Sequence, residues 1–419
     1  MARLYFGTDG VRGVVGEDLM AELVERLGRA AALWSGGGRV FVGRDTRSSG
    51  PMLEAAFAEG VASAGGNAVL GGVLPTPAVA LLTLDLAAVI SASHNPPEYN
   101  GVKFFDQDGQ KLTDASEEEM EALLDEPPRS DRGAIERVES SADGYLEHVL
   151  ERFGSDLSGL RVAVDCGNGA YSAIAPKAFE RLGADVLPLA AEPDGLNINV
   201  GCGATDLSLL QSHAGGYDLG VAFDGDGDRM LAVDAEGNTV DGDQILALLA
   251  LHLEVDVIVV TVMTNLGFHR LMEEHGIRVV TTDVGDRYVL EALRREEAIL
   301  GGEQSGHIIC LDGHVTGDGL AAALLLCRAL EGRALADAAA VMPKFAQVKE
   351  NVPARNQHLS GDLREEIARV NAELDGTARV LVRPSGTEPL IRVLAEAQDE
   401  AEAARLCGTI SALVRRELG

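Results

Sequence analysis

The sequence predicts a multidomain α/β protein with a smaller α+β domain at its carboxyl end. Apolar strand-like runs alternate with amphipathic helix-like segments through most of the chain, which is typical of largely parallel sheets covered by helices on both faces. From about residue 345, short strand-like segments flank two long helical patterns, which favours a small domain with a more antiparallel sheet. The length of 419 residues exceeds what one hydrophobic core usually supports, so several domains are expected.

The expected elements form three α/β blocks and the final α+β block. Strands are expected near 40–45 and 88–93 in the first block, near 161–170 and 220–229 in the second, near 255–262 and 278–287 in the third, and within 345–354, 378–386 and 389–397 in the last. Helices are expected near 18–34, 51–65, 172–183, 266–275, 358–375 and 399–417. In such an alternating fold, functional loops are expected at the carboxyl ends of the strands.

Composition and charge exclude several classes of protein. A formal net charge of −31 disfavours nucleic acid and anionic membrane as partners, because both require a basic surface. No apolar run is long enough for a bilayer span, and residues 1–13 lack the features of an export signal, so a cytoplasmic protein is expected. The cysteines have no C-x-x-C spacing, which indicates buried free thiols and no zinc site or disulfide framework. They are Cys166, Cys202, Cys310, Cys327 and Cys407.

Three aspartates spaced two residues apart, Asp224, Asp226 and Asp228, follow the apolar run at 220–223. Their like charges would repel strongly, and a divalent cation that prefers oxygen ligands would neutralise them, so this turn is a candidate metal site. A calcium loop of the helix-loop-helix type needs Gly at its sixth position and Glu at its twelfth, where this sequence has Arg229 and Ala235. A solvated acidic turn in an acidic protein is the alternative interpretation.

Ser93 lies at the end of another apolar run, in SASHNPPEYNGVKFF at 91–105. His94, Asn95 and two prolines follow it, so its hydroxyl is expected on a rigid turn as a nucleophile or a phosphate acceptor. The G-x-S-x-G pattern of hydrolases is absent. A proline-stiffened turn, in which Ser93 and Asn95 satisfy backbone groups, is the structural alternative.

RPSGTEPLIR at 383–392 alternates guanidinium groups with hydroxyls just after a strand. Forked arginines together with hydroxyl and amide donors favour an anion-binding nest, and an exposed charged turn is the alternative. The donors are Arg383, Ser385, Gly386, Thr387 and Arg392.

Two further glycine-rich loops carry polar side chains. GGEQSGH places Glu303, Ser305 and His307 at alternate positions, where they could converge on one ligand such as a sugar or simply form a surface turn. FGTDGVRG carries Arg12 near the amino terminus. Further cations on strand-end loops, each of which could be a solvated surface charge, are Arg44, Arg47 and Arg287.

Taken in order, FGTDGVRG, SASHNP with NGVK, DGDGDR, GEQSGH and RPSGTEP resemble the α-D-phosphohexomutase superfamily over essentially the whole chain. GEQSGH, the amino-terminal ARLYFGTDGVRG and the closing RPSGTEPLIRV resemble the bacterial phosphoglucosamine mutases in particular. The resemblance implies three related mixed-sheet α/β domains and a C-terminal α+β domain like the TATA-binding-protein fold, around a central cleft. The implied domains are 1–140 with the phosphoserine loop, 141–240 with the metal-binding loop, 241–344 with the sugar-binding loop, and 345–419 with the phosphate-binding site.

The resemblance also implies a role for each motif residue. Metal ligands for Mg²⁺ would be Asp224, Asp226, Asp228 and an oxygen of phosphorylated Ser93. Lys103 and Arg229 would lie beside the transferring phosphoryl group. Arg12 and His307 would take part in proton transfer or in positioning the phosphate. Sugar hydroxyls would be bound by Glu303 and Ser305. The phosphate that is not reacting would be held by Arg383, Ser385, Gly386, Thr387 and Arg392.

The implied enzyme is an intramolecular phosphotransferase of the isomerase class. It would interconvert glucosamine 6-phosphate and glucosamine 1-phosphate and feed UDP-N-acetylglucosamine synthesis, with glucosamine 1,6-bisphosphate as intermediate and activator. Its partner would be a small hexosamine phosphate, and the enzyme itself would be a monomer or homodimer. Phosphomannomutase or phosphoglucomutase activity, a non-catalytic sugar-phosphate sensor and a metal-dependent phosphatase are the alternatives.

Overall fold

The computed structural model describes residues 4–7, 9–138, 141–354, 358–385 and 389–418. Contacts between Cα atoms divide the chain into two compact units. Unit 1 comprises Met1–Met263 and Arg278–Ala340, and unit 2 comprises Thr264–Ile277 and Val341–Gly419. Within the described ranges, unit 1 holds three mixed sheets and unit 2 holds one antiparallel sheet.

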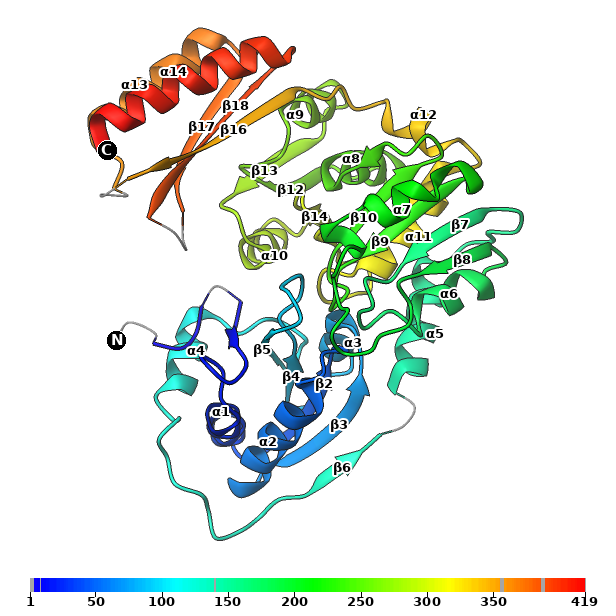
Figure 1. Ribbon diagram of the computed structural model, residues 1–419, viewed down its shortest axis with the longest axis vertical. Helices are drawn as coiled ribbons and strands as arrows, with labels where there is room; N and C mark the ends of the chain where they lie inside the picture. The colour runs from blue at the N-terminus through cyan, green and yellow to red at the C-terminus, as the bar shows by residue number, and fades with distance from the viewer. Residues whose placement is uncertain (1–3, 8, 139–140, 355–357, 386–388, 419) are drawn as a thin grey trace. The chain divides into compact units, whose positions relative to one another are not determined.

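The first sheet of unit 1 and its helices comprise β1 (Val11–Val14), α1 (Ala21–Trp34), β2 (Arg39–Arg44), α2 (Gly50–Ser63), β3 (Asn67–Val73), α3 (Thr76–Leu81), β4 (Leu86–Ile90), β5 (Tyr99–Asp106), α4 (Asp114–Glu121) and β6 (Ile135–Arg137). The strand order is β1-β5-β4-β2-β3-β6. β2 pairs in parallel with β3 and β4, whereas β5 runs antiparallel to β1 and β4. α1 and α2 pack side by side (Figure 1), so closely that a Cβ at Gly28 would come within 2.1 Å of Phe57 O. Only glycine allows this approach.

The second sheet and its helices comprise α5 (Ser141–Phe153), β7 (Arg161–Asp165), α6 (Ala175–Arg181), β8 (Asp185–Leu189), α7 (Ser208–Ser212), β9 (Leu219–Phe223), β10 (Met230–Asp234) and β11 (Thr239–Val240). The third comprises α8 (Gly242–His252), β12 (Val257–Thr261), β13 (Arg278–Thr282), α10 (Asp286–Arg295), β14 (Leu300–Gly302), β15 (Ile308–Cys310), α11 (Gly319–Leu330) and α12 (Leu335–Ala339). Their strand orders are β11-β10-β9-β7-β8 and β13-β12-β14-β15. In both sheets the inner strands pair in parallel, and antiparallel strands are added at one edge.

Three strands of unit 1 lead directly into motif residues. β4 ends shortly before Ser93, β9 ends directly before Asp224, and β14 ends directly before Glu303. All three strands are buried along their whole length, so the points at which the chain leaves the sheets are fixed by the core. The motif residues therefore follow the carboxyl ends of strands, as the alternating pattern predicts.

Unit 2 contains α9 (Leu266–Glu274), β16 (Ala346–Pro353), α13 (Gly361–Leu374), β17 (Arg379–Pro384), β18 (Leu390–Ala397) and α14 (Glu400–Leu418). The strand order is β16-β18-β17 with both pairs antiparallel, and α13 and α14 lie on one side of the sheet (Figure 1). Ile410 and Val414 of α14 are buried in one core cluster with Val393 of β18. α9 joins this unit through two hydrogen bonds of 3.0 Å between the Asn265 side chain and the backbone of Phe345. The predicted fold class, mixed α/β domains with a C-terminal α+β domain, is confirmed.

Eight α-helices in the described ranges are not predicted from the sequence pattern: α3, α4, α5, α7, α8, α10, α11 and α12. α8 and α11 are buried along most of their length, so they have no polar face to reveal a helical period. α10 begins at Asp286, inside the segment 278–287 that is predicted as a strand, because β13 already ends at Thr282. The domain boundaries near 140, 240 and 344 stay predictions.

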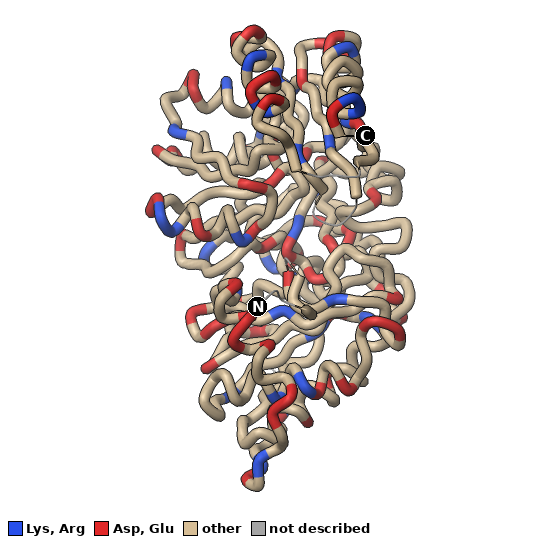
Figure 2. Tube along the Cα trace, turned by 90° about the vertical axis from the view of Figure 1, so that its left-hand side faces the viewer, with Lys and Arg blue, Asp and Glu red and all other residues tan. Residues whose placement is uncertain are grey.

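The remaining global features concern thiols, membranes and charge. All five cysteines are buried and free, as the sequence predicts. None of the helices in the described ranges combines the length and apolar character that a bilayer crossing requires. Acidic residues occur along the whole chain and are not gathered in one segment (Figure 2).

Candidate active site

Ser93 lies on a buried turn just beyond β4. The residue is 2% exposed, and its φ of 52° falls in the left-handed region that residues with a Cβ seldom adopt. Its Oγ donates a hydrogen bond to Asp224 Oδ2 at 2.6 Å. The serine loop and the aspartate turn, 131 positions apart in the chain, therefore meet.

The aspartate turn gathers three buried carboxylates. Asp224, Asp226 and Asp228 each offer an oxygen, and these oxygens lie within 4.8 Å of one another. The alternative of a solvated acidic turn is excluded, because none of the three is more than 4% exposed. Asp226 Oδ1 and Asp228 Oδ1 are buried and have no hydrogen-bond partner among the described residues. Such oxygens are costly to bury, and a hard divalent cation would satisfy them, so the residues fit Mg²⁺.

Lys103, on β5, neutralises part of this negative charge. Its Nζ lies 2.8 Å from Asp226 Oδ2, 3.6 Å from Asp228 Oδ2 and 3.2 Å from Asp9 Oδ2. Burial by itself would lower the pKa of Lys103, but these carboxylates raise it above its ordinary value, so the ammonium group stays charged. Thr76, at the start of α3, also donates its Oγ1 to Asp226 Oδ2 at 2.6 Å.

The pKa values of two of the aspartates move in opposite directions. Burial, followed by repulsion from Asp228 and Asp226, raises the pKa of Asp224 well above its ordinary value. Burial would also raise the pKa of Asp228, but Lys103 and the His307 imidazole outweigh it and lower the pKa overall. A bound cation would oppose this rise in the pKa of Asp224, because positive charge favours the ionised carboxylate.

Arg229, His307 and Arg12 surround the same cluster. Arg229 Nε lies 3.8 Å and His307 Nδ1 lies 3.7 Å from Asp228 Oδ1. Burial would lower the pKa of His307, but the neighbouring carboxylates of Asp228 and Asp286 raise the pKa above its ordinary value. Arg12, on β1, pairs with Asp9. The predicted catalytic residues are thus brought together from all three sheets of unit 1.

A cavity of about 250 Å³ lies beside these groups. It is lined by Asp9, Arg12, His94, Asp228, Arg229, Val284, Gly285, Asp286, Glu303 and His307. Glu303 Oε1 accepts a hydrogen bond of 3.0 Å from the Gly285 amide. Ser305, on the same loop, is exposed and donates to Glu303 Oε2 at 3.5 Å. The predicted sugar-binding carboxylate therefore shares one cavity with the predicted catalytic residues.

Three charged residues of the site are not predicted from the sequence: Asp9, Lys111 and Asp286. Lys111 Nζ lies 2.7 Å from Asp9 Oδ1 and also pairs with Asp286. Asp286 Oδ2 lies 3.6 Å from His307 Nε2, and these two residues form a second group of potential metal ligands with Asp228. Asp9 lies in FGTDGVRG and Asp286 directly precedes Arg287, so the sequence carries a signal close to both residues. Lys111 has no such signal.

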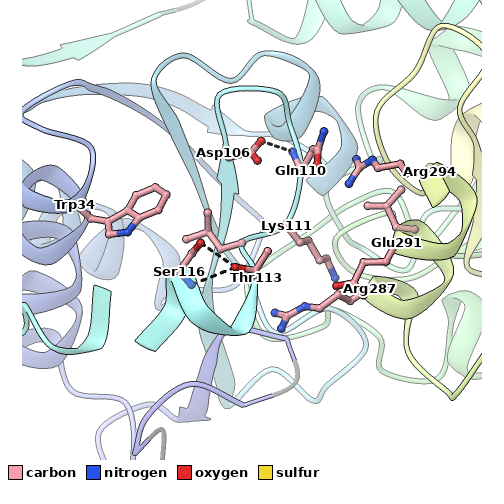
Figure 3. A pocket seen from close by; sticks show the side chains of 11 residues that line it. Trp34, Asp106, Gln110, Lys111, Thr113, Ser116, Arg287, Glu291 and Arg294 are labelled. Carbon is pink, nitrogen blue, oxygen red and sulfur yellow. Dashed lines mark hydrogen bonds between the residues drawn. The ribbon is translucent and has the colours of Figure 1, made fainter. Parts of the chain in front are cut away.

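Arg287, predicted as a further cation on a strand-end loop, pairs with α4. Its Nη2 lies 2.8 Å from Glu117 Oε1, and its Nη1 pairs with Asp114. Arg287 lines a second cavity of about 290 Å³, in which Trp34 and Arg294 stand on opposite sides and Lys111 lies between them (Figure 3). The guanidinium group therefore ties α10 to α4 and does not line the cavity beside the aspartate cluster.

In unit 2, Arg383 and Arg392 are cross-strand partners on β17 and β18. Ser385 is buried, and its Oγ lies 3.4 Å from Arg392 Nη2. Like charges opposite each other in a sheet repel, and an anion bound between them would offset that repulsion. Gly386 and Thr387, the other predicted members of the nest, lie outside the described residues.

Comparisons with known proteins place the chain in a family. Phosphoglucomutase/phosphomannomutase α/β/α domains I, II and III match residues 3–129, 143–237 and 241–345, and the C-terminal domain of that family matches residues 331–413. A phosphoglucosamine mutase from Moorella thermoacetica is 49% identical over an alignment of 425 positions that covers 95% of this chain and 96% of the relative.

Solved structures of similar fold support the same family assignment. A phosphoglucomutase/phosphomannomutase family protein from Burkholderia thailandensis has a TM-score of 0.86 at 26% identity, with 98% of this chain and 97% of that chain covered. A putative phosphomannomutase from Thermus thermophilus has a TM-score of 0.80 at 28% identity, with 98% of each chain covered. The chain therefore belongs to the phosphoglucosamine mutases, within the phosphoglucomutase/phosphomannomutase family.

Proposed function

We propose that this protein interconverts glucosamine 6-phosphate and glucosamine 1-phosphate through a phosphorylated Ser93. The observation that supports this most strongly is the hydrogen bond of 2.6 Å from Ser93 Oγ to Asp224 Oδ2. It joins a hydroxyl that can carry a phosphoryl group to a carboxylate cluster that fits a divalent cation. The identity of 49% to a relative named phosphoglucosamine mutase supports the choice of sugar.

Mg²⁺ is the proposed cofactor, held by Asp224, Asp226, Asp228 and one oxygen of phosphorylated Ser93. When bound, the ion would neutralise charge on the transferring phosphoryl group. Lys103 and Arg229, whose nitrogen atoms lie 2.8 Å and 3.8 Å from carboxylates of the cluster, would stabilise the equatorial phosphoryl oxygens.

Phosphoryl transfer would start from phosphorylated Ser93. The bond between phosphorus and Ser93 Oγ breaks as a bond forms to O1 of glucosamine 6-phosphate or O6 of glucosamine 1-phosphate, which gives glucosamine 1,6-bisphosphate. The attacking hydroxyl loses its proton, and Ser93 Oγ gains one. His307 and Arg12 line the cavity and are the proposed groups for proton transfer and phosphate positioning. The bisphosphate then turns and returns its other phosphate to Ser93, which restores the phosphoenzyme.

Two further sets of residues are proposed to bind the substrate. Glu303 and Ser305 would bind sugar hydroxyls, and the nest would hold the phosphate that is not reacting. The proposed nest residues are Arg383, Ser385, Gly386, Thr387 and Arg392. Because this nest must accept either phosphate of the turning intermediate, plain anion recognition suits it. The enzyme would work in the cytoplasm as a monomer or homodimer, with glucosamine 1,6-bisphosphate as intermediate and activator.

Phosphomannomutase or phosphoglucomutase activity is the second candidate, favoured by the 28% identity to a putative phosphomannomutase. Turnover of glucosamine, glucose and mannose phosphates by the purified protein separates the two. With Mg²⁺ and the bisphosphate present, we expect kcat/KM for glucosamine phosphate to exceed the others by at least about 10-fold.

Three other results would change the assignment. A preference for glucose or mannose phosphate would favour the second candidate. Binding of sugar phosphate without interconversion would identify a sensor, and steady release of inorganic phosphate would identify a phosphatase.

A further inference from the structure

A buried arginine holds the loop that carries Ser93. Arg47, just beyond β2, is 0% exposed, although its sequence context is that of a solvated surface charge. A buried guanidinium group is costly unless its charge and its N–H groups are satisfied. We propose that Arg47 is a positioning residue that sets the geometry of the Ser93 oxygen for phosphoryl transfer. This inference rests on the proposed mutase function and deepens it.

The Arg47 side chain has five N–H donors, and every one of them is used. Nε donates to Asp45 Oδ2 at 2.9 Å. The other four donors bind carbonyl oxygens of the Ser93 loop, which we define as residues 93–99. These bonds run from Nη2 to Ser93 O and Asn95 O, both at 2.8 Å, and from Nη1 to Tyr99 O at 3.0 Å and to Pro96 O. Arg47 therefore fixes the loop through its backbone, whichever side chains the loop carries.

The ion pair of Arg47 with Asp45 also fixes the other side of Ser93. The Ser93 amide donates to Ser91 Oγ at 2.9 Å, and Ser91 Oγ donates to Asp45 Oδ2 at 2.6 Å. The peptide groups before and after Ser93 are thus both anchored to the Asp45–Arg47 pair. This anchoring accounts for the left-handed conformation of Ser93, which a residue with a Cβ adopts only when its surroundings impose it.

The Ser93 carbonyl lies where the serine loop meets the aspartate turn. A Cβ at Gly225 would come within 2.8 Å of Ser93 O, so the two segments are in close contact. Asn199, from the loop after β8, donates its Nδ2 to the same carbonyl at 2.9 Å and to Asn95 O at 3.3 Å. Arg47 contacts the backbone of Ser93 and not its reacting oxygen, which makes it a positioning residue.

Phosphoryl transfer requires the Ser93 oxygen in line with the sugar oxygen, and a misplacement of about 1 Å can cost about 100-fold in rate. Lysine at position 47 would keep the positive charge but supply three donors from one nitrogen. At least one of the four loop carbonyls would then lose its donor from position 47, and at least two would if one donor stays on Asp45. Arg47→Lys therefore tests positioning at constant charge.

The experiment measures single-turnover transfer from phosphorylated Ser93 to glucosamine 6-phosphate, normalised to the amount of phosphorylated enzyme. For Arg47→Lys we expect the rate constant to fall by at least about 100-fold while KM for the sugar phosphate changes by less than about threefold. Arg44→Lys is the matched control, because Arg44 pairs with Glu54 at 3.6 Å and binds Asp45 O, outside the Ser93 loop. Its normalised rate should stay within about twofold of the parent.

A normalised rate of Arg47→Lys within about threefold of the parent would overturn the inference, even if the variant were less stable. If Arg47→Lys does not fold, Asp45→Asn decides, since it removes the charge paired with Arg47 and weakens the acceptor that Arg47 Nε and Ser91 Oγ share. A rate about 10-fold below the parent is then expected, and an unchanged rate overturns the inference. If the parent itself transfers no phosphoryl group, the proposed function fails before positioning can be tested.

Discussion

The site in unit 1 and the arginine nest in unit 2 use charge in opposite ways. In unit 1, cations and carboxylates alternate over short distances, and Lys103 alone lies within 3.6 Å of three carboxylates. In unit 2, two guanidinium groups, those of Arg383 and Arg392, are neighbours across two strands. The first arrangement holds its members in fixed positions, whereas the second attracts any anion. The contrast fits the proposed roles, in which unit 1 would determine the chemistry and unit 2 would hold the phosphate that does not react.

Removing the Ser93 hydroxyl should have the largest effect, because it removes the phosphoryl carrier from unit 1. In steady-state assays, Ser93→Ala is expected to lower kcat by at least about 10⁴-fold. Calorimetric titration with glucosamine 6-phosphate should show an affinity within about threefold of the parent, since the proposed phosphate nest in unit 2 is unchanged. Ser48→Ala changes an exposed serine nearby and should keep full activity. Retained mutase activity in Ser93→Ala would refute the mechanism.

Asp226→Asn should have the next largest effect, because it removes one negative charge from the cluster, on the carboxylate nearest to Lys103. We expect kcat to fall by about 100- to 1,000-fold at the parent's optimal Mg²⁺ concentration, and to recover in part when Mg²⁺ is raised. Activity as a function of Mg²⁺ concentration measures this. Asp218→Asn, which removes an exposed ion pair of 2.7 Å with Arg161, is the control. An unchanged Mg²⁺ dependence would mean that the aspartate turn holds no catalytic metal.

Arg392→Gln should act on binding more than on chemistry. Loss of a charge-assisted hydrogen bond to phosphate is expected to raise KM by about 10- to 100-fold and to change kcat much less. Arg383→Gln should raise KM by a similar factor. In the double variant, KM should rise by less than the product of the two single factors, because both residues would bind one phosphate. Arg369→Gln, in an exposed ion pair on α13, is the control. A fall in kcat at constant KM would contradict the proposal that Arg392 binds the substrate and does not take part in the chemistry.

The smallest expected effect concerns the pH dependence of stability in unit 2. Burial, followed by the charge of Arg379, lowers the pKa of His269 on α9 to about 4, from about 6.5 in an unfolded chain. Between these values the unfolded state binds more protons than the folded state, so the free energy of unfolding should fall as pH drops from about 6.5 to about 4. The stabilisation is fully present only above about pH 6.5.

Amide hydrogen exchange in α13 and α14, corrected for its intrinsic pH dependence, can follow this change at about pH 7.5 and pH 5. His269→Leu is expected to reduce the difference in protection between the two pH values, and His275→Leu, at the C-terminal cap of α9, is the control. Equal differences in the parent and in His269→Leu would contradict the assignment. Mutase activity at neutral pH should be the same in all three proteins.

The local sequence pattern is sufficient to predict which candidate functional residues follow the ends of strands. Ser93, Asp224 and Glu303 each follow a buried apolar strand, and alternating α/β folds place functional loops at such ends. The same alternation predicted the fold class. That the serine loop and the aspartate turn share one site came from the resemblance of five ordered motifs to a known superfamily, because spacing along a chain does not determine distance in space.

Contacts between residues that are far apart in the sequence cannot be predicted from the local sequence pattern. Lys111 joins Asp9 and Asp286, which are 102 and 175 positions away, and nothing near Lys111 in the sequence marks it. Arg47 resembles a solvated surface cation because four of its five acceptors are backbone carbonyls, and every residue carries one. Buried helices such as α11 were missed for a related reason, since a segment without a polar face has no helical period.

The central claim is that Ser93 carries the phosphoryl group beside the aspartate cluster. Mass spectrometry with peptide mapping tests it most directly, on purified protein before and after one equivalent of glucosamine 6-phosphate is added with Mg²⁺. We predict a phosphate adduct on the peptide that contains Ser93, and its loss as glucosamine 1,6-bisphosphate appears. An adduct on another residue, or sugar isomerisation while the Ser93 peptide stays unmodified throughout, would contradict the claim.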